Sequence, residues 1–487
     1  MKEHKKAMVT LTLLAVAIAL FSIVKLTMQH SELEDFVWIW NNSLQIAEGK
    51  RMYTDVNILT MPLAFVVEAM TAVMFGDKII VHAVNGIVLS ILVLILMYLV
   101  HRQLGKKDTW FRVMCLTVGF ILFANMYFDY NWLSILFILI ICWLENKQFK
   151  NNTVKQLVIG LTVGLVIITK QNIGFTVVLA TIAVCVVNKK YKDICLRAVG
   201  AVVVGVITIV CLIFTGTFND FWDLAVMGLF DFGSKNSQNL SMLLTNREKL
   251  PTTIVSNLFL LTSVIGFIYN IFKCKNKKIL TVQIYWIATL IFLVPLPNAV
   301  HCYLANCIGV LATVSLMDSK TSETRLLDKF KYGKLVRYLL NFSIIPICLV
   351  TVMFVQISLS KASLNRTQYD RYDSINIEES LAEDINTVGE YLESHDNAMI
   401  VDGSTAVYTY PLRRYEKYFD QMLHGNMGTI TSDDLINNIK NREETLFLVR
   451  TSDSDVFWQT DKDVITFVKE NYNAIEEVGS YTVYSKQ

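Results

Sequence analysis

Long apolar runs separated by short polar segments occupy most of the chain up to about residue 359. Two of the runs, 86–100 and 157–169, contain no charged residue at all. As a helix, an apolar run approaching about 20 residues is long enough to cross the roughly 30 Å hydrocarbon layer of a membrane. The pattern therefore predicts a polytopic α-helical membrane protein with about eleven transmembrane helices, at 7–24, 79–100, 110–125, 131–144, 156–169, 173–188, 197–215, 252–272, 279–296, 301–317 and 338–359.

The pattern changes after residue 359, where shorter periodic segments follow one another. Apolar residues at helical spacing, such as Leu381, Ile385 and Val388, alternate with short apolar strands. We expect helices at 378–394, 435–440 and 462–471, and strands at 398–401, 445–449 and 480–484. Alternating helices and strands are typical of a layered α/β domain. The sequence therefore predicts two domains, a transmembrane domain over 1–359 and a small α/β domain over 360–487.

The composition is that of a membrane protein, and it indicates which kinds of partner to expect. Hydrophobic residues make up 53% of the 487 residues and charged residues 18%, against about 25% charged in an average soluble domain. The mean hydropathy is +0.44. With a net charge of only +2 and no basic patch, we expect the lipid bilayer, and no nucleic acid, as a partner. The nine cysteines lie within or beside hydrophobic segments and form no CxxC pair, which predicts neither a disulfide framework nor a metal site.

Lysine and arginine are distributed unevenly between alternate loops. If the N-terminus is cytoplasmic, the loops on that side hold 23 of these residues and the loops on the other side hold 6. Cytoplasmic loops of membrane proteins carry such an excess. The count therefore predicts a multi-pass protein of the cell membrane with a cytoplasmic N-terminus. With an odd number of helices, the domain 360–487 is then extracytoplasmic.

The first outer loop, 29–77, opens with acidic residues that include Glu34 and Asp35. Carboxylates beside a membrane span are costly to bury, so they usually lie in a water-filled cavity or at the membrane interface. Alternatively, these acids only cap the helix that follows them, because negative charge is favourable at a helix N-terminus. Both interpretations fit this loop taken by itself.

The same loop contains two segments that predict interfacial helices. The first, 36–47, is amphipathic, and its Trp38 and Trp40 suit a helix that lies in the membrane–water interface. The second, 63–75, is apolar and begins after Pro62, a residue that favours the start of a helix.

A recognisable series of residues runs through this loop: Glu34-Asp35, Gly49, Tyr53-Thr54-Asp55, Pro62-Leu63 and Phe75-Gly76. The series resembles the first extracytoplasmic loop of GT-C membrane glycosyltransferases, the relatives of protein O-mannosyltransferases and lipid A aminoarabinose transferases. The many helices, the cytoplasmic N-terminus and the outer C-terminal domain fit the same layout. The chain has Pro-Leu where many members have Pro-Pro, and Glu-Asp where the better-known members have Asp-Glu.

The resemblance implies an enzyme of the cell envelope. Such an enzyme moves a hexose or pentose from a polyprenyl-phosphate donor to an extracytoplasmic acceptor, which is a glycan, a lipid or a protein. The resemblance implies direct displacement within the domain 1–359, with Asp35 or Glu34 as the base that deprotonates the acceptor hydroxyl. Which of the two carboxylates acts is left open. The sequence requires no cofactor and no metal, although a divalent cation stays open.

A cation is needed to stabilise the lipid phosphate as it leaves. Lys170 is the first candidate, because it is the only basic residue in its outer turn and has Gln171 and Asn172 as neighbouring donors. The alternative is a lysine that snorkels to the membrane surface from a helix end. Arg51 could bind the phosphate through its planar fork of donors, or it could equally anchor the loop to lipid headgroups.

Five further residues complete the predicted substrate-binding set. Tyr53 and Asp55 belong to the loop series that resembles the glycosyltransferases. His301 and Tyr303 open a later helix on the outer side, where some relatives have a similar element, and a packed, hydrogen-bonded histidine is the alternative. Asp129 lies in an outer turn between aromatic residues, for which an aromatic belt is the simpler explanation.

Two other functions fit parts of the pattern. A polysaccharide ligase or polymerase of the cell envelope would use the same lipid-linked chemistry. A membrane transporter would also have many helices, but the sequence contains no visible inverted repeat, and its ionisable residues gather toward one face of the membrane. Convergence of Asp35, Lys170 and His301 on one outer cavity would favour a glycosyltransferase.

Overall fold

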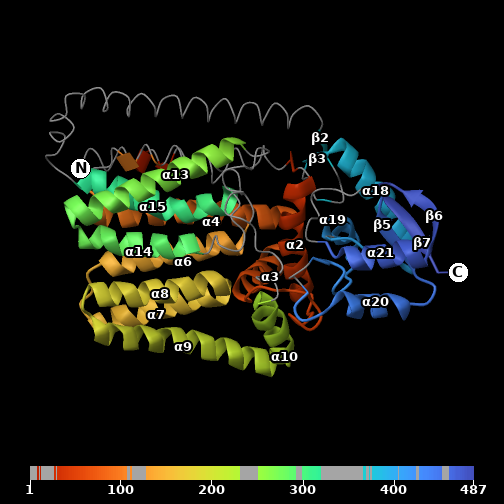
Figure 1. Cartoon of the computed structure of the whole chain (residues 1–487), viewed down its shortest axis with the longest axis horizontal. Helices are drawn as coiled ribbons and strands as arrows, with labels where there is room; N and C mark the ends of the chain where they lie inside the picture. The colour runs from red at the N-terminus through yellow and green to blue at the C-terminus, as the bar shows by residue number, and fades with distance from the viewer. Residues whose placement is uncertain are drawn as a thin grey trace. The chain divides into compact units, whose positions relative to one another are not determined.

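The computed structural model describes residues 30–106, 128–230, 250–291, 299–319, 376–403, 405–423, 427–451 and 460–486, with several shorter stretches between them. The chain forms two compact units (Figure 1). The first unit consists of Met1–Val24, Val84–Ile207 and Gln238–Lys361, and the second of Lys25–Ala83, Thr208–Ser237 and Ala362–Gln487. The predicted domain boundary between residues 359 and 360 lies outside the described residues and stays a prediction.

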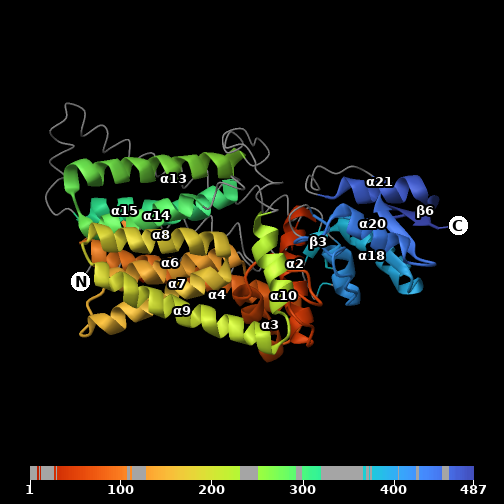
Figure 2. The same cartoon turned by 60° about the horizontal axis from the view of Figure 1, so that its bottom comes forward.

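The first unit is a bundle of long helices that lie side by side (Figures 1 and 2). The first turn of α4 and the last turns of α9 are assigned to the second unit. The helices are α4 (Ile79–Leu104), α6 (Tyr130–Asn146), α7 (Asn152–Thr169), α8 (Gln171–Val187), α9 (Tyr191–Phe214), α13 (Leu250–Tyr269) with its extension η2 (Asn270–Cys274), α14 (Lys277–Ile291) and α15 (Ala299–Ser319).

Eight of the predicted transmembrane segments coincide with these helices, which confirms their helical structure. The other three, 7–24, 110–125 and 338–359, lie almost entirely outside the described residues, so the count of eleven stays a prediction. In the described part of the chain, four helices are both long and apolar enough to cross a membrane: Ile79–Leu104, Asn152–Thr169, Tyr191–Phe214 and Asn257–Cys274.

Glycines allow two helices of this bundle to approach each other closely. Gly160 and Gly164 lie about one turn apart on α7 and face α9. A Cβ atom at Gly160 would overlap the carbonyl oxygen of Arg197, and one at Gly164 would lie 2.7 Å from the Cβ of Val204. Gly200 of α9 meets the backbone of α7 in the same way. Small residues at such positions let helix backbones pack closely in a membrane, where hydrophobic force between helices is weak.

In the second unit, the side chains of helix α2 (His30–Ala47) are buried from residue 36 to residue 45. Trp38 is 7% exposed and meets the ring of Phe65 edge-on, with ring centroids 5.6 Å apart. Trp40 is fully buried, and its Nε1 donates to the carbonyl oxygen of Asp77 at 3.3 Å. The prediction that these tryptophans lie in the membrane–water interface is therefore wrong. Segments that follow α2 in the chain cover them, and the local pattern does not reveal this.

Helix α3 (Leu63–Phe75) leaves an apolar face uncovered. Its exposed large side chains are Val66, Met70, Val73, Met74 and Phe75. Three of them, at positions 66, 70 and 73, follow the spacing that places residues on one side of a helix. An uncovered apolar side is typical of a helix that lies in the membrane interface, and the interfacial placement of this segment stays a prediction.

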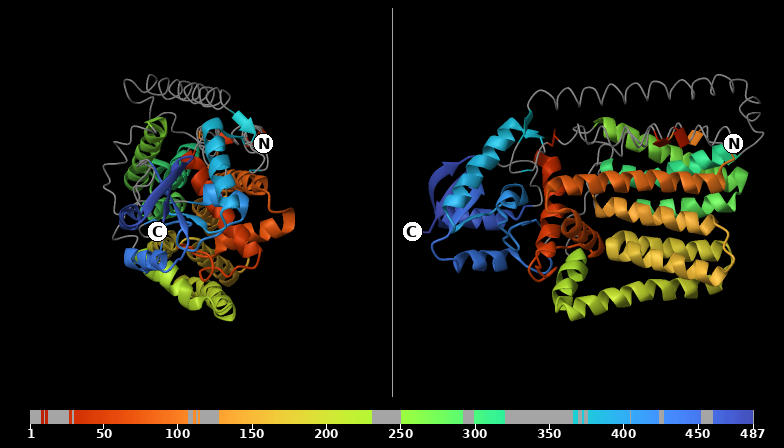
Figure 3. Two further views of the ribbon diagram at one scale, coloured as in Figure 1. Left: turned by 90° about the vertical axis from the view of Figure 1, so that its right-hand side faces the viewer. Right: turned by 180° about the vertical axis from the view of Figure 1, so that it is seen from behind.

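The last part of the chain contains a four-stranded sheet in the order β4–β5–β7–β6, blue in Figures 1 and 3. The β4 and β5 strands are parallel, and the other pairs are antiparallel. The strands are β4 (Ala398–Ile400), β5 (Leu446–Arg450), β6 (Asn473–Val478) and β7 (Tyr481–Ser485). The accompanying helices are α18 (Glu379–Ser394), α19 (Ala406–Thr409), α20 (Ser432–Lys440) and α21 (Lys462–Asn471).

A buried apolar cluster forms the core of this region, and its members include Met399, Val401, Phe419, Phe447, Val464 and Val468. The predicted helices and strands agree with the observed bounds to within three residues. Strand β6 was not predicted. Neither was the small sheet of β1 (Thr27–Met28), β2 (Arg366–Gln368) and β3 (Asn376–Glu378).

Candidate functional site

Lys170 forms the whole connection between two helices of the first unit. Helix α7 ends at Thr169 and α8 begins at Gln171, and the backbone N–H of Lys170 still donates to the carbonyl oxygen of Val166 at 3.0 Å. The Nζ of the half-buried Lys170 lies 2.6 Å from Oδ1 of Asn131 and 4.6 Å from the centroid of the Tyr130 ring. The ammonium group is therefore held by an amide oxygen and an aromatic face.

Asn131 is oriented by Asp129, which is the N-cap residue of α6. The Asp129 Oδ1 accepts from the backbone N–H of Asn131 at 3.0 Å, and the Asn131 Nδ2 donates to Asp129 Oδ2 at 2.9 Å. Because the amide nitrogen of Asn131 faces a carboxylate, its oxygen must face the ammonium of Lys170. Asp129 is 4% exposed and Asn131 is 6% exposed, so this chain of three polar groups is largely shielded from solvent.

The N-termini of α6 and α8 both lie at this cluster, at Asp129 and Lys170 respectively. Helix N-termini carry partial positive charge and attract anions. Asp129 already caps the N-terminus of α6, whereas the N-terminus of α8 has no side-chain cap, so the ammonium of Lys170 and the start of α8 are the groups here that would attract a phosphate. Of the two neighbouring predicted donors, Gln171 is half-buried in the first turn of α8. The Oδ1 of Asn172 accepts from the backbone N–H of Ile173 at 2.9 Å.

Arg51 and Asp55 form an ion pair within the first outer loop, in the second unit. Arg51 Nη2 lies 3.2 Å from Asp55 Oδ1, and Asp55 Oδ2 also accepts from the backbone N–H of Arg51 at 2.8 Å. These hydrogen bonds lower the pKa of Asp55 below its ordinary value. The side chain of Arg51 is 54% exposed, but Asp55 already occupies part of its donor fork. Arg51 is therefore a weaker candidate for a phosphate than Lys170.

Tyr53 stabilises the loop between these two residues. Its backbone is left-handed, with φ at 69°, and its side chain is fully buried. The hydroxyl donates to the carbonyl oxygen of Thr60 at 2.9 Å, and the ring meets that of Phe221 edge-on, with centroids 5.2 Å apart. Burial raises the pKa of Tyr53 well above its ordinary value. These contacts use Tyr53 for packing, whereas the loop series predicts it among the ligands of the substrate.

Residues of the C-terminal region contact the same loop within the second unit. The Nζ of Lys417 donates to the carbonyl oxygen of Thr54 at 2.5 Å, and the hydroxyl of Thr54 donates to Asp220. Tyr415 also donates to Glu48 Oε2 at 3.4 Å. Sequence reasoning missed Lys417, because a lysine 363 residues from its partner has no local signal.

Sequence reasoning also missed a buried polar pair, His82 and Glu68, which lies beside α2. His82 Nδ1 and Glu68 Oε2 are 2.6 Å apart, and both side chains are fully buried. The His82 ring stacks on Trp40, with centroids 5.5 Å apart, and packs against Phe36 at 4.7 Å. Glu68 and His82 each lie among apolar residues in the sequence, which does not show that α3 packs against α4 and brings the two side chains together.

The remaining predicted site residues cannot be placed by their side chains. Glu34 and Asp35 lie on α2, and His301 and Tyr303 lie on α15, but all four side chains are outside the described part of the structure. The structure brings Lys170 together with Asp129, and Arg51 together with Asp55. These two groups belong to different units.

The fold is similar to that of GT-C membrane glycosyltransferases, the class that the loop series resembles. Two structures of ArnT, the lipid A aminoarabinose transferase, from Cupriavidus metallidurans match 98% of this chain and 98% of their own. Each has a TM-score of 0.62. One of them is bound to undecaprenyl phosphate and is 13% identical to this chain, and the other is in the apo state and is 14% identical.

A weaker match is the oligosaccharyltransferase from Archaeoglobus fulgidus, in a complex with zinc and sulfate. It has a TM-score of 0.47 and 13% identity over 79% of this chain and 55% of that chain. No protein-family model and no curated protein matches the sequence significantly. At such low identities the likeness establishes the fold alone.

Proposed function

We propose that the chain is an integral membrane glycosyltransferase. It takes a sugar from a polyprenyl-phosphate donor and transfers it to an acceptor on the extracytoplasmic side of the membrane. The observation that carries the proposal is the position of Lys170, whose ammonium is held by Asn131 at the N-termini of two bundle helices. The ArnT-like fold and the loop series around Asp35 support the same function.

In the proposed reaction, the acceptor hydroxyl attacks the anomeric carbon of the donor sugar. A carboxylate of α2, Asp35 or Glu34, takes the hydroxyl proton as the new C–O bond forms. The bond between the anomeric carbon and the phosphate oxygen breaks at the same time, and its electron pair leaves with the lipid phosphate. Lys170 stabilises the charge that develops on that phosphate, because a positioned cation acts most strongly on charge formed in the transition state.

Asp129 supports this reaction indirectly in the proposal. It fixes Asn131, and Asn131 fixes the ammonium of Lys170. We therefore assign Asp129 and Asn131 as positioning residues, in place of the sugar-binding role considered for Asp129 from the sequence.

The experiment is sugar transfer by the purified full-length protein from a panel of polyprenyl-phosphate sugars. Lys170→Ala should lower turnover by about 10²- to 10³-fold, the loss seen when one donor to a developing anion is removed. Lys170→Arg should recover only part of this loss, because a guanidinium is not equivalent to a compact ammonium charge. Lys189→Ala is the matched control, since Lys189 is exposed and lies at the far end of α8.

The two carboxylates are tested in the same assay. Asp35→Asn and Glu34→Gln are compared, and the variant that lacks the base should lose about 10²- to 10⁴-fold in turnover. Wild-type turnover in Lys170→Ala would remove this lysine from the reaction. Near wild-type turnover in both carboxylate variants would refute base catalysis by α2. Absence of transfer from every donor, by a folded wild-type protein, would refute the proposed function.

A further inference from the structure

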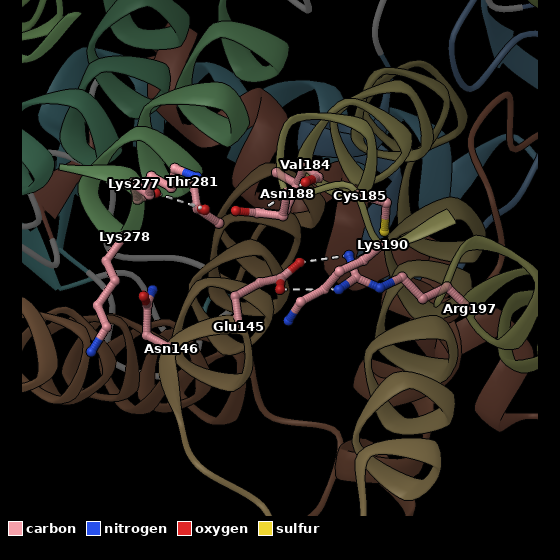
Figure 4. Close-up of a pocket in the computed structure, with 10 residues that line it drawn as sticks. All are labelled: Glu145, Asn146, Val184, Cys185, Asn188, Lys190, Arg197, Lys277, Lys278 and Thr281. Carbon is pink, nitrogen blue, oxygen red and sulfur yellow. Dashed lines mark hydrogen bonds and ion pairs between the residues drawn. The ribbon is translucent and has the colours of Figure 1, made fainter. Parts of the chain in front are cut away.

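A cavity of about 170 Å³ lies at the end of the helix bundle opposite to Lys170 (Figure 4). It is partly open and is lined by the C-terminal ends of α6 and α8 and the N-terminal ends of α9 and α14. A water molecule needs about 10–15 Å³ of such space, so the cavity has room for several waters or for a phosphate group. The positive-inside count predicts that this end of the bundle faces the cytoplasm.

A buried ion pair forms the floor of the cavity. Arg197 Nη1 lies 2.6 Å from Glu145 Oε1, and Arg197 Nη2 lies 3.0 Å from Glu145 Oε2. Dashed lines between the two side chains mark these contacts in Figure 4. Gln156 and Tyr285 hold this pair from behind the cavity lining, because Arg197 Nε donates to Gln156 Oε1 at 2.7 Å and Tyr285 donates to Glu145 Oε1 at 3.1 Å. Among the described residues that line the cavity, Glu145 is the one carboxylate, and Arg197 already neutralises it.

Three lysines, Lys190, Lys277 and Lys278, add positive charge to the wall of the cavity. Within the described residues, no carboxylate lies within ion-pair distance of these three ammonium groups. Asp193, in the first turn of α9, accepts from Asn152 Nδ2 at 3.2 Å and does not line the cavity. The lining residues thus carry a surplus of three positive charges.

Basic residues are common at the cytoplasmic ends of helices, so the charge alone does not indicate a site. Lys155 illustrates the ordinary role, since its Nζ donates to the carbonyl oxygens of Glu145 and Lys147, at 2.7 and 3.0 Å, and so caps α6. In the part of the chain that the structure describes, Lys190 and Lys278 make no such contact, and they extend on either side of Glu145 in Figure 4. A cavity lined by a hydrogen-bonded ion pair and by lysines that have no carboxylate partner among the described residues differs from a merely basic loop.

We propose that this cavity binds a phosphate group, with Lys190, Lys277 and Lys278 as its counter-charges and the Arg197–Glu145 pair as its fixed floor. Basic pockets between transmembrane helices on the cytoplasmic side are suited to the headgroups of anionic lipids. The phosphate belongs either to such a headgroup or to a soluble phosphate, and both present the same chemistry to the lysines. The inference is independent of the proposed sugar transfer at the opposite end.

The test measures the thermal stability and the retained lipid of the full-length protein in nanodiscs. The nanodiscs contain phosphatidylcholine alone, phosphatidylcholine mixed with phosphatidylglycerol, or phosphatidylcholine alone with added inorganic phosphate. A triple variant, Lys190→Gln, Lys277→Gln and Lys278→Gln, is compared with the wild type. The matched control is Lys150→Gln, Lys189→Gln and Lys273→Gln, which removes the same charge from exposed positions at the same end of the bundle.

Phosphatidylglycerol should raise the melting temperature of the wild type and of the control, and native mass spectrometry should find the lipid retained in both. The affinity of the triple variant for phosphatidylglycerol should be about 100-fold lower than that of the wild type, taking about fivefold for each lysine. The same selective loss with inorganic phosphate, in place of phosphatidylglycerol, would identify a soluble phosphate as the ligand. Equal responses of the triple variant and the control, or no response of the wild type, would overturn the proposal. Should the triple variant not fold, Lys190→Gln alone is compared with Lys189→Gln.

Discussion

Replacement of Asn131 by alanine separates the positioning of Lys170 from its charge. In the structure, the Asn131 amide joins two charged groups, because it donates to the Asp129 carboxylate at 2.9 Å and accepts from the Lys170 ammonium at 2.6 Å. Asn131→Ala removes both contacts and leaves the two charges in place. We expect the melting temperature to fall modestly and the sugar-transfer turnover to fall strongly.

The expected magnitude is set by the contacts that are lost. A hydrogen bond to a charged group contributes about 1.5–3 kcal/mol, and each 1.36 kcal/mol corresponds to a factor of about ten in rate. If the whole contact between Asn131 and Lys170 is used in the transition state, turnover should fall by about 10- to 100-fold. Asp129 keeps its bond to the backbone N–H of residue 131 at 3.0 Å, so the fold loses only part of the support at this helix end.

The assay compares turnover, KM and melting temperature for Asn131→Ala, Asn131→Asp and a control. Asn131→Asp places a second carboxylate beside Asp129 and neutralises Lys170, so its turnover should fall further than that of Asn131→Ala. Asn471→Ala is the control, because Asn471 is exposed on α21 and its Nδ2 donates to the carbonyl oxygen of Phe467, far from Lys170 in the sequence. Wild-type turnover in Asn131→Ala would show that Lys170 does not depend on this amide, and the positioning role would be abandoned.

Two further predictions concern stability. Gly160→Ala should lower the melting temperature and the folded yield, because the new Cβ would overlap the backbone of Arg197. Gly205→Ala, on α9, is the control: its Cβ would meet no atom within 4 Å, so the variant should be neutral or slightly stabilising. Equal effects of the two variants would contradict the close contact of α7 with α9. Burial raises the pKa of Asp420 from 3.8 to about 7, so the folded chain binds the Asp420 proton more tightly than the unfolded chain does. The protonated Asp420 side chain therefore contributes to the free energy of unfolding below about pH 4, and this contribution is lost as the pH rises through 7. The melting temperature of the wild type minus that of Asp420→Asn should therefore decrease between about pH 5 and pH 8, and an unchanged difference would refute the shifted pKa.

The sequence predicts helices well where hydrophobicity alone determines them. Segments such as 131–144 and 156–169 must be helical in a membrane, since their backbone polar groups can only be satisfied internally. Strand β6 (Asn473–Val478) escaped prediction because it is an edge strand, exposed at five of its six residues, and lacks an apolar alternation. The prediction that Trp38 and Trp40 of α2 lie in the membrane interface is wrong for a different reason, which is that their apolar character does not distinguish two environments. An aromatic residue suits both an interface and a core, and only the segments that cover it decide between the two.

The sequence indicates some residues of the candidate site and gives no signal for others. Lys170 could be found, because a charged residue between two apolar runs is conspicuous in a sequence. Asn131 could not, since an asparagine after Asp129 also fits an ordinary helix start. The pairing of His82 with Glu68, 14 residues apart, depends on how α3 and α4 pack, and Lys417 reaches Thr54 from the other end of the chain. Partners that are distant in sequence become visible only when the chain has folded.

The single-residue connection between α7 and α8 constrains how this protein can evolve. Each residue added to a helix rotates the remainder of that helix by roughly 100°, since a turn contains 3.6 residues. An insertion or deletion beside Lys170 would therefore turn one helix relative to the other and carry its buried side chains out of register. The chemistry proposed for Lys170 restricts which residue stands at this position, and the helix register restricts in addition how many residues stand there. Descendants of this chain should vary in their long loops while keeping a single residue between Thr169 and Gln171.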